Sequence, residues 1–260
     1  MDYTLIKYPR TPHLEGSRLQ EGDEDLRQVP FSDILGRHIV IEEKIDGANT
    51  AISFDGEGKL LLQNRGHYLT SGYRERHYNL LKQWAYNNTE ALYRALGSRY
   101  IMYGEWMYAK HTVFYDALPA YFMEFDIYDR ERDVFLSTEG RREITGPIGF
   151  IHSVPVLAQG VFTAKKAVLA YLGNSHFITE DHLAVLCTLA ERQGLDAQRQ
   201  CRETDPSRLM EGLYIKIEED GVVKSRVKFV RASFLQCVNE SQTHWQQRPI
   251  IPNQLAEARR

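Results

Sequence analysis

Several short stretches of the chain alternate hydrophobic and polar residues with a period of two, the pattern of half-buried β-strands. Turn sequences such as Asp55-Gly56-Glu57-Gly58 and Glu218-Glu219-Asp220-Gly221 separate neighbouring stretches and predict hairpins. The predicted strands are Ile39–Ile41, Thr50–Phe54, Lys59–Gln63, Tyr100–Gly104, Tyr121–Asp129, Glu211–Ile217 and Val222–Val230. In Tyr121–Asp129, the alternation predicts Phe125 and Ile127 on one face and Phe122, Glu124 and Asp126 on the other.

Helical spacing of hydrophobic residues marks three segments, 76–96, 163–172 and 180–192, the first of them broken near Asn87-Asn88. Strands and helices together predict an α+β fold of antiparallel sheets flanked by helices. A chain of 260 residues is long enough for one large domain. We therefore predict a single domain over residues 1–260, with a helical insertion at about 156–205 beside the sheets.

Composition narrows the class of protein without identifying it. Hydrophobic residues make up 43% and charged residues 26% of the chain, which is ordinary for a globular protein. The formal net charge is −3, so any contact with nucleic acid must come from a local basic face. No signal-peptide or membrane-span pattern occurs, and Cys187, Cys201 and Cys237 suit neither a disulfide framework nor a zinc site. A cytoplasmic location is the resulting expectation.

The most informative stretch is His38–Phe54, in which Lys44 stands between a β-branched strand and the tight turn at Asp46-Gly47. A strand end beside a glycine turn is a good position to hold an amine against a ligand. The pattern Lys-x-Asp-Gly alone is also compatible with a solvated lysine followed by an ordinary turn, so its context must decide.

Basic residues supply part of that context. Lys224, Arg226 and Lys228 alternate within one predicted strand, which predicts that their side chains share a face. Like charges repel, so such a row calls for an anion opposite it; the alternative is a solvated edge strand protected by cations. Arg65 directly follows another predicted strand and is placed to converge on the same site.

Read in chain order, these pieces match motifs I, Ia, III, IIIa, IV and V of the covalent nucleotidyltransferases. The matching residues are Lys44-Ile45-Asp46-Gly47, Arg65-Gly66, Glu105, Phe125-Asp126, Glu211-Gly212 and the row Lys224/Arg226/Lys228. The chain most resembles the ATP-dependent RNA ligases of the RNA ligase 2-like group, from about residue 8 to residue 235. Further matching positions are Tyr8–His13, Glu43, Asn49, Gly104, Tyr108–His111, Tyr115–Pro119 and Lys228–Arg231.

The resemblance implies a nucleotidyltransferase (ATP-grasp-like ligase adenylation) domain and a role for each motif. Lys44 would be the nucleophile that accepts AMP, with its pKa lowered by neighbouring cations and a metal. Asp46, Arg65, Glu211 and Lys228 would complete the catalytic set. The residues expected to bind the nucleotide are Glu43, Lys44, Asn49, Arg65, Glu105, Phe125, Glu211, Arg226 and Lys228.

Within that nucleotide set, Glu105 would bind the ribose hydroxyls, Phe125 would stack on adenine and Asn49 would contact the phosphate end. Glu211 would be the metal ligand, mostly through water, because Mg²⁺ keeps several waters. Either Lys224/Arg226 or Arg226/Lys228 is the working pair of motif V, and Lys228 lies nearer the family pattern.

The implied reaction joins RNA ends that carry a 5′-phosphate and a 3′-hydroxyl, with ATP and Mg²⁺ (or Mn²⁺) as cofactors. AMP passes from ATP to Lys44, then to the 5′-phosphate, and is released when the 3′-hydroxyl attacks. About thirty residues follow Arg231, which is too few for an OB-fold, so we expect no OB-fold domain.

Several alternatives remain open at this point. These are a minimal DNA or RNA–DNA nick ligase, a guanylyl-transferring capping enzyme and a catalytically inactive module that binds RNA ends. The sequence does not determine the preferred RNA substrate, an end-healing kinase or phosphatase partner, or the oligomeric state. No membrane partner is expected.

Overall fold

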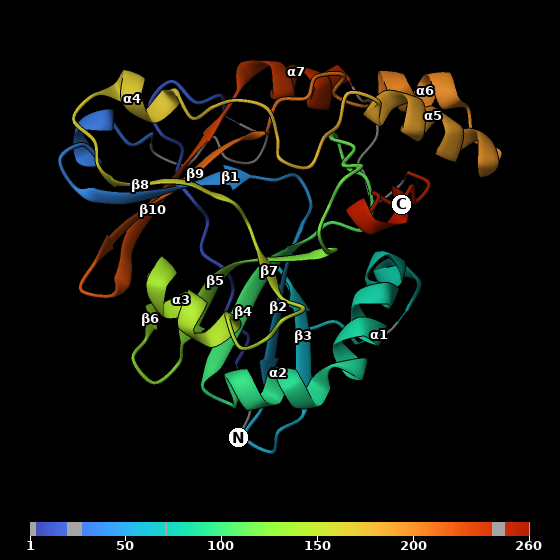
Figure 1. The fold of residues 1–260 in the computed structure, drawn as a ribbon. Helices are drawn as coiled ribbons and strands as arrows, with labels where there is room; N and C mark the ends of the chain where they lie inside the picture. The colour runs from blue at the N-terminus through green and yellow to red at the C-terminus, as the bar shows by residue number, and fades with distance from the viewer. Residues whose placement is uncertain (1–3, 20–27, 71, 241–247, 260) are drawn as a thin grey trace.

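The structure is a computed structural model that describes residues 4–19, 28–70, 72–240 and 248–259. Its strands form two sheets, with helices on their outer sides (Figure 1). The upper sheet has the order β10-β9-β1-β8 and the lower sheet the order β3-β2-β4-β5-β6, with β7 added beside β5. All pairings are antiparallel except that of β5 with β7. The predicted fold class is thereby confirmed.

The bounds of the elements follow the predicted pattern with a few exceptions. The strands are β1 His38–Lys44, β2 Ala48–Phe54, β3 Leu60–Asn64, β4 Tyr100–Trp106, β5 Phe122–Asp129, β6 Val134–Phe135, β7 His152–Ser153, β8 Val156–Val161, β9 Gly212–Glu219 and β10 Val222–Val230. The helices are α1 Asn79–Asn87, α2 Thr89–Leu96, α3 Thr138–Thr145, α4 Lys165–Leu169, α5 His182–Arg192, α6 Ala197–Arg202 and α7 Ala232–Glu240. Short 3-10 helices occur at η1 Phe31–Asp33, η2 Tyr73–Tyr78 and η4 Ala256–Arg259.

The upper sheet has one apolar and one charged face, because its strands alternate residue types. Ile39 and Ile41 of β1 point into a hydrophobic cluster with residues of β9 and β10, η1 and α4. Glu42 and Lys44 have the opposite parity and lie on the face that is turned toward the lower sheet. The apolar face of the upper sheet is thus covered on the side away from the lower sheet. Its charged face lies between the two sheets.

The lower sheet buries its outer face under α1, α2 and α3 (Figure 1). α1 and α2 are separated at Asn88, which confirms the predicted break near Asn87-Asn88. The prediction for the faces of β5 is wrong, because Phe122 and Ile127 lie in the same outer cluster. The register between β4 and β5 shifts at Tyr103/Gly104, so Phe125 is an extra residue that reverses the alternation.

The predicted helical insertion at 156–205 is also wrong in its first part. Residues 156–161 form β8, which pairs with β1 at the edge of the upper sheet. The remainder holds α4, α5 and α6, of which α4 spans only five residues. A β-strand of this kind is hard to recognise locally because Gln159 and Gly160 interrupt its apolar run.

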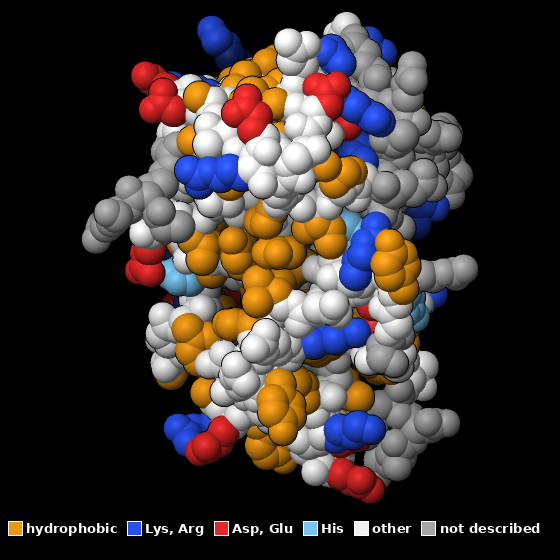
Figure 2. All heavy atoms as spheres, turned by 90° about the vertical axis from the view of Figure 1, so that its right-hand side faces the viewer, with side chains coloured by type: hydrophobic (Ala, Val, Ile, Leu, Met, Phe, Trp, Pro, Cys, Tyr) orange, Lys and Arg blue, Asp and Glu red, His pale blue; other side chains and the backbone are white. Residues whose placement is uncertain are grey.

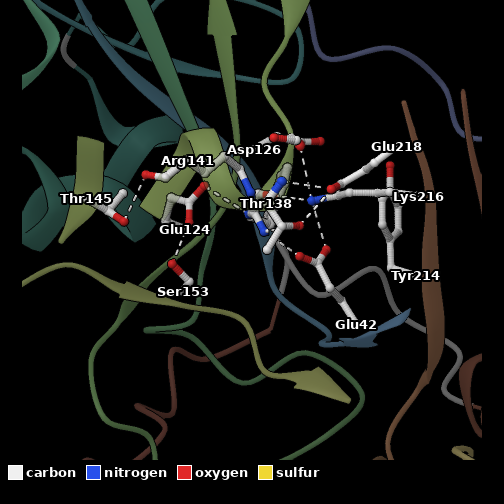
Figure 3. Close-up of polar contacts among 12 residues, drawn as sticks. Glu42, Glu124, Asp126, Thr138, Arg141, Thr145, Ser153, Tyr214, Lys216 and Glu218 are labelled. Carbon is white, nitrogen blue, oxygen red and sulfur yellow. Dashed lines mark hydrogen bonds and ion pairs between the residues drawn. The ribbon is translucent and has the colours of Figure 1, made fainter. Parts of the chain in front are cut away.

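A buried network of charged side chains joins the two sheets (Figure 3). Lys216 of β9 is fully buried, with its Nζ 2.9 Å from Glu42 Oε2 of β1 and 3.0 Å from Asp126 Oδ1 of β5. Arg141 reaches in from α3 and pairs with Glu42 Oε1 at 2.6 Å and with Glu124 Oε1 at 3.0 Å. Residues from both sheets and one helix therefore share their charges where water is excluded.

The same network fixes the bulge in β5. Both Lys216 and Arg141 donate hydrogen bonds to the carbonyl oxygen of Phe125, the extra residue. Tyr8 donates to Asp126, and burial would raise the pKa of Asp126, but Lys216, Arg226 and Arg141 outweigh burial and lower it. The bulged backbone is thus held by charge-assisted hydrogen bonds rather than by apolar packing alone.

In the described part of the chain, no helix is long and apolar enough to cross a membrane.

We expect Lys216→Ala to lower the free energy of unfolding by roughly 3–5 kcal/mol, because it leaves the buried Glu42 and Asp126 without their shared cation. Urea unfolding followed by circular dichroism measures this loss. Arg94→Ala is the matched control, since Arg94 forms only an exposed pair with Glu90 at 2.7 Å and should cost about 0.5 kcal/mol or less. Equal losses in the two variants would contradict the role given to the network.

Candidate active site

Lys44 is the last residue of β1, and its amine contacts the carboxylate of Glu211, the residue just before β9. Its Nζ lies 2.7 Å from Oε2 of Glu211, the residue before β9, and the lysine side chain is 21% exposed. The register that pairs Lys44 with Gly212 brings the two together. Glu105 of β4 approaches from the lower sheet, where its Oε1 accepts a hydrogen bond from the Gly47 N–H at 3.2 Å. The amine is therefore accessible and flanked by acids from both sheets.

These acids carry shifted pKa values because they are close to one another and partly removed from water. Burial raises the pKa of Glu105 to about 8, and the neighbouring Glu211 and Asp46 add to the rise. Burial likewise raises the pKa of Glu211 to about 7, although Lys44 and Lys228 act against it. Both carboxyl groups therefore resist ionisation chiefly because they are removed from water, and the neighbouring acids add to this.

The expectation that cations lower the pKa of Lys44 is wrong for the ligand-free protein. Burial acts in that direction, but the nearby carboxylates of Glu211 and Glu105 outweigh it, and the pKa of Lys44 is raised. The amine is therefore held as an ammonium by its acidic neighbours. An added cation close to those carboxylates would be needed to shift Lys44 toward the neutral form.

Asp46 has a positional role in this structure. Its Oδ2 accepts hydrogen bonds from the backbone N–H groups of Thr112 and Val113 at 2.8 and 2.9 Å. Its own N–H donates to the hydroxyl of Tyr115 at 2.8 Å, and His111 Nδ1 lies 3.7 Å from Oδ1. The carboxylate thus ties the turn after Lys44 to the loop that follows β4, and these contacts lower its pKa despite burial.

Three glycines next to the acids allow close approach of the chain. A Cβ on Gly212 would lie 1.9 Å from the carbonyl oxygen of Phe229, and one on Gly47 would lie 2.6 Å from Met107 Sδ. A Cβ on Gly104 would meet the ring of Phe122 at 2.5 Å. Asp46, Glu105 and Glu211 therefore each stand beside a residue that must lack a side chain.

The remaining nucleotide-binding candidates are distributed around this centre. Asn49 of β2 lies opposite Glu105 in the sheet. Phe125 is half-buried, with its ring edge-on to Tyr8 at 5.1 Å between centroids. Glu43 has the opposite parity from Lys44, and its buried carboxylate accepts hydrogen bonds from Ser175 Oγ at 2.5 Å and from the His176 N–H at 3.2 Å. The side chain of Glu43 is thus used to anchor the segment before α5.

The basic residues do not form the predicted single row. A register shift between Val223 and Ser225 interrupts the alternation, and Lys224 is an exposed residue that pairs with Asp220 at 3.2 Å. Arg226 lies 3.7 Å from Asp126 and over the ring of Phe135 at 4.1 Å, so it belongs to the network between the sheets. Lys228 is buried and acts on the pKa of Glu211. The shift therefore separates Lys224 from Arg226 and Lys228, which keep the same parity in β10 but have different neighbours.

Arg65 is the candidate that the structure leaves apart. It follows β3 in an exposed loop, at the end of the lower sheet that also carries Asn49 and Glu105. Within the described residues it has no ion pair with the acids around Lys44.

Two residues that support the site were missed by the sequence reasoning. Asn253 is fully buried; its amide donates to the Met107 carbonyl at 2.6 Å and accepts from the Tyr115 N–H at 2.9 Å. This pins the loop that clamps Asp46, from a segment 138 residues further along the chain. Lys216 was missed although a local signal exists, since it is a cation among the apolar residues Leu213, Ile215 and Ile217 of one strand.

The donor set suits a hard divalent cation held largely by water. In the described ranges, no group of three or more His, Cys, Asp or Glu side chains is arranged to hold a metal ion by itself. The carboxylate oxygens of Glu211, the expected metal ligand, are nevertheless the ligand type that Mg²⁺ and Mn²⁺ prefer.

With this geometry in place, comparisons with known proteins identify the class. The model of the RNA ligase family matches residues 37–230. The chain therefore belongs to the RNA ligase family, as the resemblance predicted. No curated protein matches it.

Solved structures confirm the fold. One mutant of the Naegleria gruberi RNA ligase with ATP and Mn is 15% identical, with a TM-score of 0.55 over 89% of this chain and 58% of that one. A second mutant with ATP and Mn is 13% identical, with a TM-score of 0.53 over 80% and 54% of the two chains. A mutant with AMP and Mn is 13% identical, with a TM-score of 0.53 over 91% and 65%. The present chain spans less than two thirds of each of these relatives.

The raised pKa of Glu105 predicts that the ligand-free protein loses stability as the pH rises. A carboxyl group whose pKa rises on folding favours the folded chain while protonated, so stability falls between its usual value and the raised value, here from 4.5 to about 8. We expect Glu105→Gln, with chelator present, to be more stable than the natural chain at pH 9 by about 1 kcal/mol and to show less difference at pH 5.

Urea unfolding at the two pH values measures the effect, and Glu90→Gln, which changes an exposed acid, is the control. An unchanged pH dependence in Glu105→Gln would show that Glu105 ionises normally.

Proposed function

We propose that this chain is an ATP-dependent RNA ligase that seals a 5′-phosphate to a 3′-hydroxyl through AMP bound covalently to Lys44. The observation that carries the proposal is the pairing of the accessible Lys44 amine with Glu211, beside Glu105, at the edge of a charged sheet face. Membership of the RNA ligase family supports the reaction class. The relatives with ATP or AMP and Mn support the choice of nucleotide and metal.

In the first step, the lone pair of Lys44 Nζ attacks the α-phosphorus of ATP, and the bond to the β-phosphate oxygen breaks to release pyrophosphate. The amine must lose protons, and Glu211, which accepts a hydrogen bond from Nζ at 2.7 Å, is placed to take one. Mg²⁺ or Mn²⁺, when bound, would neutralise charge on the acids and the phosphates. Glu211 is the residue that would hold it, mostly through water.

The protein's own side chains then account for nucleotide position. Phe125 offers its ring as a stacking surface, and its backbone is held by Lys216 and Arg141. Glu105 would bind the ribose, and Asn49, its neighbour across the sheet, would contact the phosphate end. Lys228, with Arg65 from the exposed loop, would neutralise the α-phosphate.

In the second and third steps, the RNA 5′-phosphate attacks the adenylate phosphorus and displaces Lys44. The 3′-hydroxyl then attacks the activated phosphate and AMP leaves. The competing functions are a DNA or RNA–DNA nick ligase and an inactive module that binds RNA ends. Sealing assays on nicked duplexes with RNA or DNA on each side of the break separate the first, and absence of a lysine adduct despite RNA binding would indicate the second.

Intact mass spectrometry after incubation with ATP and Mg²⁺ should show a gain of one AMP, and peptide mapping should place it on Lys44. We expect Lys44→Ala to abolish the adduct while leaving the chain folded, because a strand-end lysine packs little, although Glu211 loses its partner. Lys59→Ala, at an exposed lysine before β3, is the control that should keep the adduct. Adduct formation from GTP but not ATP, or on another side chain, would refute the proposal.

Variants of Lys228 and Arg226 should distinguish an effect on the reaction from an effect on stability. Lys228→Ala should slow adduct formation by roughly 10-fold or more, because it removes a cation next to Glu211. Arg226→Ala should instead lower the free energy of unfolding by about 2 kcal/mol or more, because it weakens the compensation of the buried Asp126. Single-turnover adduct formation and urea unfolding of both variants give the comparison, and a reversed pattern would show that Arg226 is the working cation.

A further inference from the structure

Tyr73 in η2 is the most exposed large hydrophobic residue among those that the structure describes, at 81%. Its ring is not isolated, because the guanidinium carbon of Arg76 lies over it, 4.7 Å from the centroid. A ring that stays exposed and contacts an arginine side chain contributes little to the stability of the fold. The same pair is well suited to stacking on a base and meeting its phosphate.

Tyr73 belongs to η2, which packs against β4, the strand that carries Glu105. The carbonyl of His77 in η2 accepts a hydrogen bond from Trp106 Nε1 at 2.9 Å, and Trp106 directly follows Glu105 in β4. At the end of η2, burial raises the pKa of Tyr78 to about 12, with a smaller contribution from Glu105, and the Tyr78 side chain hydrogen-bonds to that of Asn64. The loop that carries Arg65 begins at Asn64, so η2 and that loop border the same end of the lower sheet.

A buried acid holds η2 against that loop. Glu75 is 6% exposed, and its carboxylate accepts from Lys82 Nζ at 2.5 Å and from the Thr70 N–H at 3.2 Å. His67 of the Arg65 loop lies 3.7 Å from the same carboxylate. Burial opposes ionisation, but Lys82 and Thr70 outweigh it and lower the pKa of Glu75. These contacts of Glu75 thus hold η2, which carries Tyr73 and Arg76, in a fixed position.

Residues 65–88, which include η2 and the Arg65 loop, carry a net positive charge, whereas the whole chain is net negative. Residues 65–88 contain Arg65, Arg74, Arg76 and Lys82 but only one acid, Glu75, whereas the chain has a net charge of −3. Figure 2 looks onto the side of the molecule that carries α1, where hydrophobic side chains gather across the middle and Lys and Arg side chains lie among them. A basic surface interleaved with aromatic rings is complementary to single-stranded nucleic acid.

We propose that Tyr73 and Arg76, here called the Tyr73 surface, bind the RNA strand that enters the active site. Tyr73 stacks on an unpaired base while Arg76 contacts a neighbouring phosphate. The inference rests on the proposed RNA ligase function and adds the place where RNA is held before its end is activated.

Fluorescence anisotropy with a labelled 5′-phosphorylated single-stranded RNA of about ten nucleotides measures binding without the reaction. We expect Tyr73→Ala to raise the Kd about 5-fold or more and Tyr73→Trp to restore it, because stacking requires a ring rather than a hydroxyl. Arg76→Gln should reduce the slope of log Kd against log salt by about 0.7, the loss of one phosphate contact. Tyr86→Ala is the control, since Tyr86 is 77% exposed but lies at the far end of α1.

A Kd for Tyr73→Ala equal to that of the natural chain would overturn the inference, as would equal losses in Tyr73→Ala and Tyr86→Ala. Circular dichroism unfolding of each variant checks that the fold persists. Failure here differs from failure of the proposed function, which would appear as absence of the AMP adduct in the natural chain. An adduct that forms normally in a chain whose RNA binding ignores Tyr73 would refute this surface alone.

Discussion

The ion pairs of Lys216 are the interaction on which the arrangement of the site depends. Glu42 and Asp126 come from different sheets, and Lys216 is the buried cation that both carboxylates share, beside Arg141 at Glu42 and Arg226 at Asp126. The same ammonium holds the carbonyl of Phe125, so the spacing of the sheets and the position of a predicted adenine-stacking ring are set together. Lys44 lies two residues after Glu42 on the same face of β1, so the contacts that fix Glu42 also help to position Lys44.

The candidate active site differs from that network in its balance of charge. Between the sheets, acids and cations alternate and compensate one another. Around Lys44, the carboxylates of Glu211 and Glu105 raise the pKa of the amine, while burial raises the pKa of Glu105 to about 8 and that of Glu211 to about 7. This imbalance suits a site that is completed by a divalent cation, and it explains why the cation-lined pocket expected from the sequence is absent around Lys44 in the described structure.

Errors in the sequence-based assignment have a common physical origin. Period-two alternation predicts which residues share a face only while the register is unbroken. The extra residue at Phe125 and the shift at Lys224 each break it. The assignment of β8 to a helical insertion failed because a strand at a sheet edge is stabilised by its partner, β1, which is distant in sequence.

The sequence by itself determined the strands around Lys44, the order of the motifs and the glycines beside the three acids, because these depend on local geometry and spacing. It also supplied the membership that the family comparison confirmed. Only the tertiary structure decided which charges meet: Lys44 with Glu211, Arg226 with Asp126, and Asn253 with the loop that clamps Asp46. Pairing energies inside a protein depend on distance and exclusion of water, and neither is encoded in the neighbours of a residue along the chain.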